Sequence, residues 1–226
     1  MPPFIGILSL DTRFPRILGD AGHVESYHLP ARLRVVAGAD APLIVRDGQP
    51  ATDLIARFTE AAQELEAEGA VLITSTCGFL ISVQDRIARS VRIPVLLSAL
   101  SLLPTVRAAT GGRPVGILTA SATALGSAAL AAAGCRADEV RIMGMQDDPA
   151  FAATFLAPKA RQAQALDPAA IGDAVCEAAL RLVAQSPEIG AILLECGNLP
   201  PYAAQVRKAT GRPVFSILDG ARMLAG

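Results

Sequence analysis

Short apolar runs alternate along this chain with longer amphipathic segments. Each run has about the length of a buried strand, and most are rich in Val, Ile and Leu. Strands that alternate with helices form parallel sheets whose faces are covered by those helices. The pattern therefore predicts an α/β fold with strands at residues 4–10, 33–36, 70–73, 95–97, 115–118, 140–143, 191–194 and 214–217.

Helical spacing is clearest from residue 54 to residue 67, where apolar side chains recur every three or four positions. Asp53 is expected to cap this helix and Gly69 to end it. Further helices are expected over about 80–90, in the Ala-rich stretch that ends at 133, over 168–185, before the last strand and at the C-terminus.

The chain also repeats itself. Residues 77–95 read CGFLISVQDRIARSVRIPV and residues 196–214 read CGNLPPYAAQVRKATGRPV, an offset of 119, and Gly-Ile-Leu occurs at both 6–8 and 116–118. We therefore expect two pseudo-symmetric halves, 1–113 and 114–213, each a parallel sheet flanked by helices. The segment 214–226 is expected to pack back on the first half, and the active site to lie in the cleft between the halves.

Composition removes several classes of function. A net charge of −1 with mixed signs gives no basic stripe for nucleic acid, and no apolar run approaches the length of a membrane span. The N-terminus has no charged region before its first apolar run, so we interpret it as a strand and expect a cytoplasmic protein. No CxxC occurs, and the two histidines lie far from every cysteine, so we expect no metal site.

Four cysteines are expected to be free thiols rather than disulfides. Cys135 and Cys176 lie in Ala-rich surroundings and are expected to pack as small apolar residues. Cys77 and Cys196 occupy matching places after a strand in each half, so we predict that these two are catalytic.

Ligands of parallel α/β folds bind at the carboxyl ends of the strands. A thiol at such an end is expected to have a lowered pKa, because the N–H groups of the following helix favour the thiolate. The same N–H groups, made accessible by glycine, can hold a substrate carboxylate. The residues expected to bind substrate are Asp11, Thr12, Arg16, Thr76, Gly78, Phe79, Thr119, Ser121, Thr123, Gly197 and Asn198. The hydroxyls from 119 to 123 are equally expected as a helix cap and turn.

With GILSLDT at the first strand, TSTCG and LECGN at the two cysteines, and GILTASAT opening the second half, the chain resembles the aspartate/glutamate racemase superfamily over its whole length. That superfamily also holds hydantoin racemases, maleate isomerases and arylmalonate decarboxylases. Glutamate racemases usually have Asn-Thr after the first cysteine and Thr-His after the second. Gly78-Phe79 and Gly197-Asn198 stand here instead, which is closer to the hydantoin-racemase-like branch.

The resemblance implies a racemase or epimerase of a small carboxylate, such as an amino acid or derivative, that works without pyridoxal phosphate, metal or other cofactor. One thiolate would remove the α-proton and the opposite thiol would return a proton to the other face. It also implies a homodimer. The alternatives are a maleate-type cis-trans isomerase, a decarboxylase, and a carboxylate-binding protein without catalysis, which would have no need of two reactive thiols.

The stretch from Arg13 to His28 stands apart because it combines Pro15, two glycines and several charges. We expect a long loop, and such loops are usually functional or disordered. It leaves the first strand beside the predicted site, so it is predicted to close over the pocket. Arg16, whose planar guanidinium suits a carboxylate, is its expected substrate contact.

Overall fold

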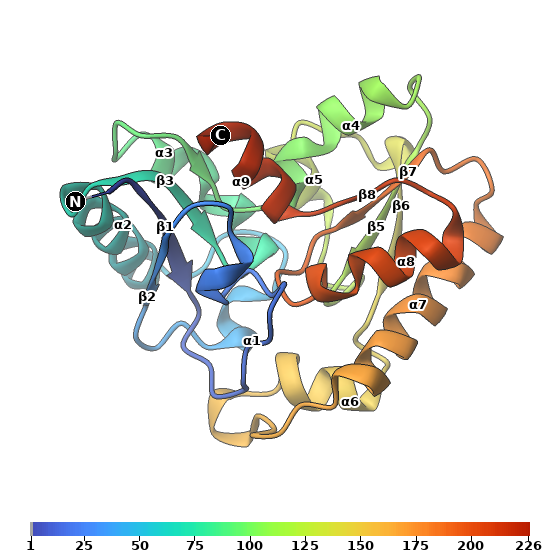
Figure 1. The fold of residues 1–226 in the computed structure, drawn as a ribbon, viewed down its shortest axis with the longest axis horizontal. Coiled ribbons are helices and arrows are strands. Elements are labelled where there is room, and N and C mark those ends of the chain that lie inside the picture. The colour runs from blue at the N-terminus through green and yellow to red at the C-terminus, as the bar shows by residue number, and fades with distance from the viewer. Residues whose placement is uncertain (1) are drawn as a thin grey trace.

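The computed structural model describes residues 2–226 and contains two four-stranded parallel sheets (Figure 1). The strand orders are β2-β1-β3-β4 and β6-β5-β7-β8, so the two halves have the same topology. This confirms the predicted α/β class and the repeat. The strands are β1 (Phe4–Ser9), β2 (Ala31–Val35), β3 (Ala70–Ser75), β4 (Val95–Leu96), β5 (Val115–Thr119), β6 (Val140–Gly144), β7 (Ala191–Leu194) and β8 (Val214–Phe215).

Helices flank both sheets and join successive strands. The α-helices are α1 (Ala41–Ile44), α2 (Thr52–Ala67), α3 (Gln84–Ala88), α4 (Leu103–Ala109), α5 (Ser127–Ala132), α6 (Pro149–Phe151), α7 (Pro168–Gln185), α8 (Ala203–Thr210) and α9 (Ile217–Ala225). Shorter helical turns that matter for the site are the 3₁₀ turn η2 (Gly78–Val83) and the π-helical turn η5 (Ala152–Leu156).

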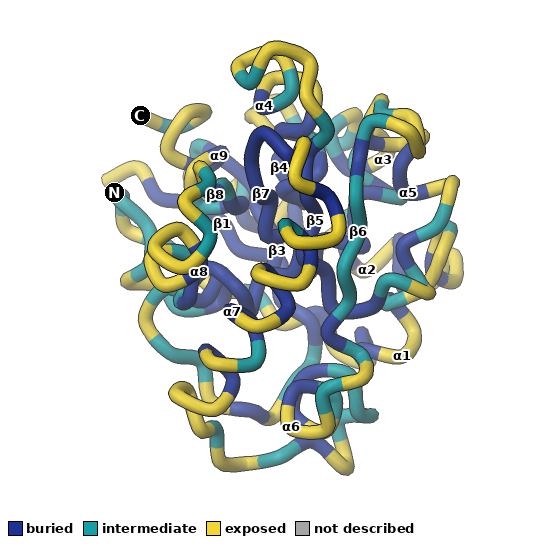
Figure 2. The backbone as a smooth tube through the Cα atoms, turned by 90° about the vertical axis from the view of Figure 1, so that its right-hand side faces the viewer, coloured by how far each residue is buried: buried dark blue, intermediate teal, exposed yellow. Residues whose placement is uncertain are grey.

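The Gly-Ile-Leu repeat is explained by close packing of one helix on the central strand of each half. A Cβ on Gly6 would lie 3.0 Å from the side chains of Leu65 and Ile73, and a Cβ on Gly116 would lie 3.0 Å from Leu182. Leu65 belongs to α2 and Leu182 to α7. β1 and β5, the strands that carry these glycines, are completely buried, as the dark tube through the middle of Figure 2 shows for β5. The glycines therefore let a long helix lie directly against the core strand.

The C-terminal segment divides between the halves. β8 pairs with β7 of the second sheet, whereas α9 packs against β3 and β4 of the first (Figure 1). The strand expected over 214–217 therefore ends at Phe215, and Ser216 caps α9 through a reciprocal hydrogen-bonded pair with Asp219.

Other differences from the sequence-based elements are local. α2 begins at Thr52 after Ala51, so Asp53 lies in its first turn and is not its cap. The helix expected over 80–90 is the turn η2 followed by the short α3, because residues after Cys77 tighten to 3₁₀ geometry. The sequence patterns did not predict α1 or α4, which are both short. No helix in the described part of the chain is long and apolar enough to cross a membrane.

Candidate active site

The two predicted catalytic cysteines follow β3 and β7, and the backbones of the two turns that carry them lie in direct contact. A Cβ on Gly78 would lie 2.4 Å from the backbone oxygen of Glu195, the residue before Cys196. In the mirrored contact, a Cβ on Gly197 would lie 2.4 Å from the backbone oxygen of Thr76, the residue before Cys77. Only glycine fits at either position. The glycines of the two Cys-Gly pairs therefore serve to bring the two cysteine turns together.

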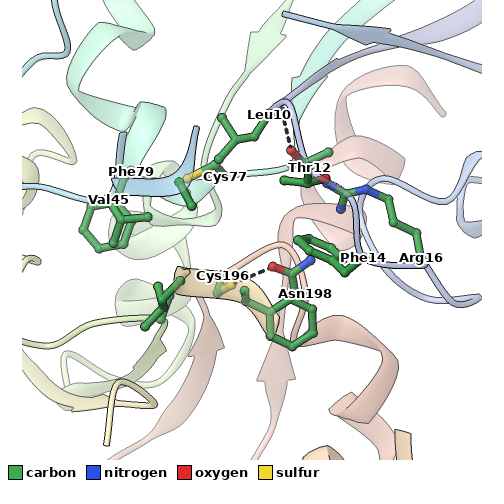
Figure 3. A pocket seen from close by; sticks show the side chains of 15 residues that line it. Leu10, Thr12, Phe14, Arg16, Val45, Cys77, Phe79, Cys196 and Asn198 are labelled. Carbon is green, nitrogen blue, oxygen red and sulfur yellow. Dashed lines mark hydrogen bonds between the residues drawn. The ribbon is translucent and has the colours of Figure 1, made fainter. Parts of the chain in front are cut away.

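Cys77 and Cys196 face each other across a small cavity with a volume of about 30 Å³ (Figure 3). Arg16 and Asn198 lie on one side of the thiols, and Phe79 and Val45 on the other. Residues of both halves line the cavity: Leu10, Thr12, Phe14, Arg16, Ala41, Val45, Thr76, Cys77, Gly78, Phe79, Ala120, Phe155, Leu156, Cys196 and Asn198.

The pKa values of both thiols are raised, which is opposite to the sequence-based expectation. Burial raises the pKa of Cys77 to about 12, and the nearby Glu195 carboxylate adds to the effect. Burial and the Glu195 charge also raise the pKa of Cys196 well above its ordinary value. The backbone N–H groups of Phe79 and Leu80 do lower the pKa of Cys77, as expected of a helical N-terminus, but the loss of water outweighs them.

Glu195, the residue before Cys196, has a buried carboxyl next to the cysteine turns. It is 1% exposed, its Oε2 accepts a hydrogen bond of 2.8 Å from the Thr119 hydroxyl, and its Oε1 has no partner in the described chain. The unpartnered oxygen lies against Gly78, where a Cβ would come within 2.2 Å of it. Burial raises the pKa of Glu195 to about 7, so this carboxyl changes charge near neutral pH.

Arg16 lies at the polar end of the cavity, held by neighbours in its own loop. Its Nη1 donates to Asp20 at 2.7 Å and its Nη2 to the Thr12 hydroxyl at 3.3 Å, while the guanidinium lies 4.9 Å from the centre of the Phe14 ring. The side chain is only 12% exposed. The sequence-based expectation that Arg16 faces the site agrees with this geometry, and its contact with substrate stays a prediction.

Five of the eleven residues predicted to bind substrate do not line the cavity: Asp11, Thr119, Ser121, Thr123 and Gly197. Asp11 forms an ion pair with Lys159 and accepts from the Gly38 amide. Ser121 and Thr123 bond to each other at 3.0 Å, and Ser121 also accepts from the Ala124 amide, so these hydroxyls stabilise a turn.

The loop from Arg13 to His28 already packs against the second half. The Ala21 amide donates to the Gly197 carbonyl at 2.9 Å, and Asp20 and Ala21 are buried. Its closure as a lid stays a prediction.

The sequence patterns did not indicate most of the apolar part of the cavity. Ala41 of α1 and Val45 directly after it line the cavity, as do Phe155 and Leu156 of η5; these four residues form its apolar roof. The Phe155 ring contacts the Phe14 ring edge to face at 4.8 Å. Three of the chain's seven Phe line this one cavity, in a sequence with only 4% aromatic residues, but the sequence does not show that these three come together.

Cys135 and Cys176 lie outside the cavity. Burial and a hydrogen bond to Glu139 raise the pKa of Cys135 to about 11, and burial also raises the pKa of Cys176. Within residues 2–226, no cluster of three or more His, Cys, Asp or Glu side chains could hold a metal ion.

Known proteins similar to this chain fall into two groups. No protein-family model matches the sequence. Solved structures share its fold at low identity: allantoin racemase from Klebsiella pneumoniae (15% identical, TM-score 0.67, covering 99% of this chain and 86% of that one) and arylmalonate decarboxylase (18%, 0.62, covering 99% and 93%). Glutamate racemase from Bacillus anthracis is similar too (13%, 0.56, covering 95% and 77%). The chain thus shares the fold of these racemases and of the decarboxylase, as the resemblance of its motifs implied.

Proteins that are similar in sequence indicate a narrower family than the solved structures do. A dimethylsulfoniopropionate lyase from Durusdinium sp. clade D is 31% identical over 96% of this chain and 72% of its own length. Dimethylsulfoniopropionate lyase 7 from Emiliania huxleyi is 34% identical over 96% of this chain and 64% of its own length. The chain spans only 56% of lyases 3 and 6 of that organism. The motifs did not predict this family, and on the Durusdinium match the chain belongs to the dimethylsulfoniopropionate lyase family.

Proposed function

We propose that this chain is a lyase that removes the α-proton of a small carboxylate and expels a leaving group from the β-carbon. Dimethylsulfoniopropionate is its candidate substrate. The observation that carries the proposal is the cavity itself: two facing thiols open into it, and Arg16 is its only charged lining residue in the described chain. The relatives that match nearly the whole chain are named dimethylsulfoniopropionate lyases, which supports the same reaction class.

The reaction follows from the structure of the candidate substrate. A thiolate takes a proton from the carbon next to the carboxylate, and the electron pair of that C–H bond forms a carbon–carbon double bond. The β-carbon–sulfur bond breaks, and its electron pair leaves with sulfur as neutral dimethyl sulfide. The other product is acrylate, and the proton stays on the cysteine until solvent removes it. No electrons are exchanged with an outside reagent.

The lining residues suit the two ends of such a zwitterion. The Arg16 guanidinium and the Thr12 hydroxyl offer donors to the carboxylate and to the charge that builds on it during proton removal. The rings of Phe14, Phe79 and Phe155 offer their faces to a sulfonium, since aromatic rings attract alkylated cations. The apolar roof keeps water from the reacting carbon.

Elimination and racemisation begin with the same proton removal. A sulfide leaves without needing a proton, so elimination requires one base, whereas racemisation requires a second thiol that returns a proton to the opposite face. The α-carbon of dimethylsulfoniopropionate is a CH₂ group, so it has no stereochemistry to invert. The paired, facing thiols keep racemisation of a chiral carboxylate as the second candidate function.

The test supplies dimethylsulfoniopropionate to the purified chain and measures dimethyl sulfide in the headspace and acrylate by NMR. We expect equal amounts of both, lost in Cys77→Ser and retained in the matched control Cys135→Ser, whose thiol lies outside the cavity. In parallel, chiral amino acids and hydantoins are incubated in deuterium oxide. Deuterium uptake with inversion, and no dimethyl sulfide at millimolar substrate, would replace the lyase with the racemase.

A further inference from the structure

Asp20 is a buried carboxylate that neither lines the cavity nor has a part in the reaction above. It is 3% exposed and lies in the loop after β1. Its Oδ1 accepts from Arg16 Nη1 at 2.7 Å and from the Gly22 amide at 2.6 Å. Its Oδ2 accepts from Asn198 Nδ2 at 2.7 Å. Asp20 thus joins the loop of the first half to the residue two positions after Cys196.

This bond fixes the orientation of the Asn198 amide. An ionised carboxylate only accepts hydrogen bonds, so the NH₂ group of Asn198 must face Asp20 and its oxygen must face away. That oxygen lies 3.5 Å from the sulfur of Cys196, which donates to it. An amide oxygen cannot donate, so the contact exists only while Cys196 carries its proton.

Cys77 has different neighbours. The backbone N–H groups of Phe79 and Leu80 and the Arg16 charge favour its thiolate, against burial and the Glu195 charge. For Cys196 the Asn198 N–H favours the thiolate, whereas burial and the charges of Glu195, Asp20 and an ionised Cys77 oppose it. The two thiols are therefore unequal although their turns are mirrored.

We propose that Asp20 is a positioning residue: by fixing the Asn198 amide it holds Cys196 as the protonated thiol, so that Cys77 is the first of the pair to ionise. These protonation states of Cys77 and Cys196 are those of the protein without substrate. Their catalytic meaning, with Cys77 supplying the first thiolate, rests on the function proposed above.

Asp20→Asn tests the orientation directly. Arg16 and Gly22 both donate to one oxygen of residue 20, so the new side chain keeps its oxygen there and turns its NH₂ toward Asn198. The Asn198 amide then flips, and its Nδ2 faces the sulfur of Cys196. A donor replaces an acceptor, which favours the thiolate.

The measurement is the rate of alkylation of each cysteine by iodoacetamide from pH 6 to pH 10, resolved by mass spectrometry of the peptides. Alkylation needs the thiolate, so each unit by which a thiol pKa falls raises the thiolate fraction below that pKa by about tenfold, a gain that the lower nucleophilicity of the thiolate offsets in part. We expect Cys77 to react faster than Cys196 in the parent, and Cys196 to gain about tenfold or more in Asp20→Asn. Cys135, which is remote from the cavity, serves as the internal reference.

A second variant separates orientation from charge. Asn198→Leu keeps the side-chain bulk and the Asp20 charge but removes the acceptor, and it too should accelerate Cys196. If Cys196 reacts faster in Asp20→Asn but not in Asn198→Leu, Asp20 acts only through its charge and the positioning role is overturned. An unchanged rate of Cys196 in both variants would overturn it as well. If Asp20→Asn does not fold, Asn198→Leu decides alone. The readout needs no substrate, so it stands apart from a failure to release dimethyl sulfide.

Discussion

Replacing Glu195 by Gln removes a charge from the most deeply buried carboxyl of the site. Burial raises the pKa of Glu195 to about 7 from an ordinary 4.5, and its Oε1 has no hydrogen-bond partner in the described residues. Glu195 therefore binds more protons in the folded protein than in the unfolded chain between pH 4.5 and pH 7. Its contribution to the free energy of unfolding must fall as pH rises through this window.

The size of this effect follows from the pKa difference. Each pKa unit corresponds to about 1.4 kcal/mol, so ionised Glu195 costs the folded state about 3 kcal/mol above pH 7. Between pH 5 and pH 8 the change is about 2.5 kcal/mol. Glutamine has no charge to bury, so the free energy of unfolding of Glu195→Gln, relative to the parent, should rise by about that amount over the same interval.

Urea unfolding of both proteins at half-unit steps from pH 5 to pH 8 measures this difference, because all other titrating groups are shared. Thr119→Val is the matched control. This variant lacks the hydroxyl that lowers the pKa of Glu195. Its free energy of unfolding should therefore fall at a higher pH than that of the parent. Parallel curves for the parent and Glu195→Gln would refute a buried carboxyl that titrates near neutrality.

Four further substitutions test the site. Cys77→Ser should lower kcat/KM for elimination by about 10²–10⁴-fold, the usual contribution of a general base, whereas Cys196→Ser should keep measurable elimination but lose any racemisation. Comparable loss in both would contradict a single base. Arg16→Lys keeps the charge but loses the planar fork, so KM for a carboxylate substrate should rise about 10-fold or more, with little change in melting temperature as the sign of an intact fold. Gly78→Ala places a methyl group 2.2 Å from a carboxylate oxygen and should destabilise by about 1–3 kcal/mol in thermal unfolding. An unchanged melting temperature would show that the two cysteine turns can separate.

The positions of the strands along the chain and the pairing of the cysteines could be predicted from sequence, because both depend on local patterns. Buried strands need continuous apolar runs, and Pro168–Gln185 and Ala191–Leu194 have the bounds that their patterns predicted. The Cys-Gly repeat predicted where the two halves converge. Short elements such as α1 and η5 have too few residues for periodicity to show, so the apolar roof of the cavity was missed.

The electrostatics of the site could not be predicted from sequence, because they depend on depth. A helical N-terminus after Cys77 was expected to lower the pKa of its thiol, and its N–H groups do act in that direction. The dominant influence is burial, with Glu195 next, and Glu195 approaches Cys77 only because the second half folds against the first. Asp11 was likewise predicted to be a site residue because it follows a strand. Its carboxylate instead forms an ion pair with Lys159, which is 148 positions away in the sequence.

The mirrored glycine contacts also decide how a ligand can enter. Backbone meets backbone at Gly78 with Glu195 and at Gly197 with Thr76, so the two halves are pinned along the midline beside the thiols. A clamshell motion, in which the halves swing apart about a hinge, would have to break both contacts. We therefore expect a ligand to enter by displacing the apolar side chains of Val45, Phe155 and Leu156, which line the cavity, and not by separation of the halves.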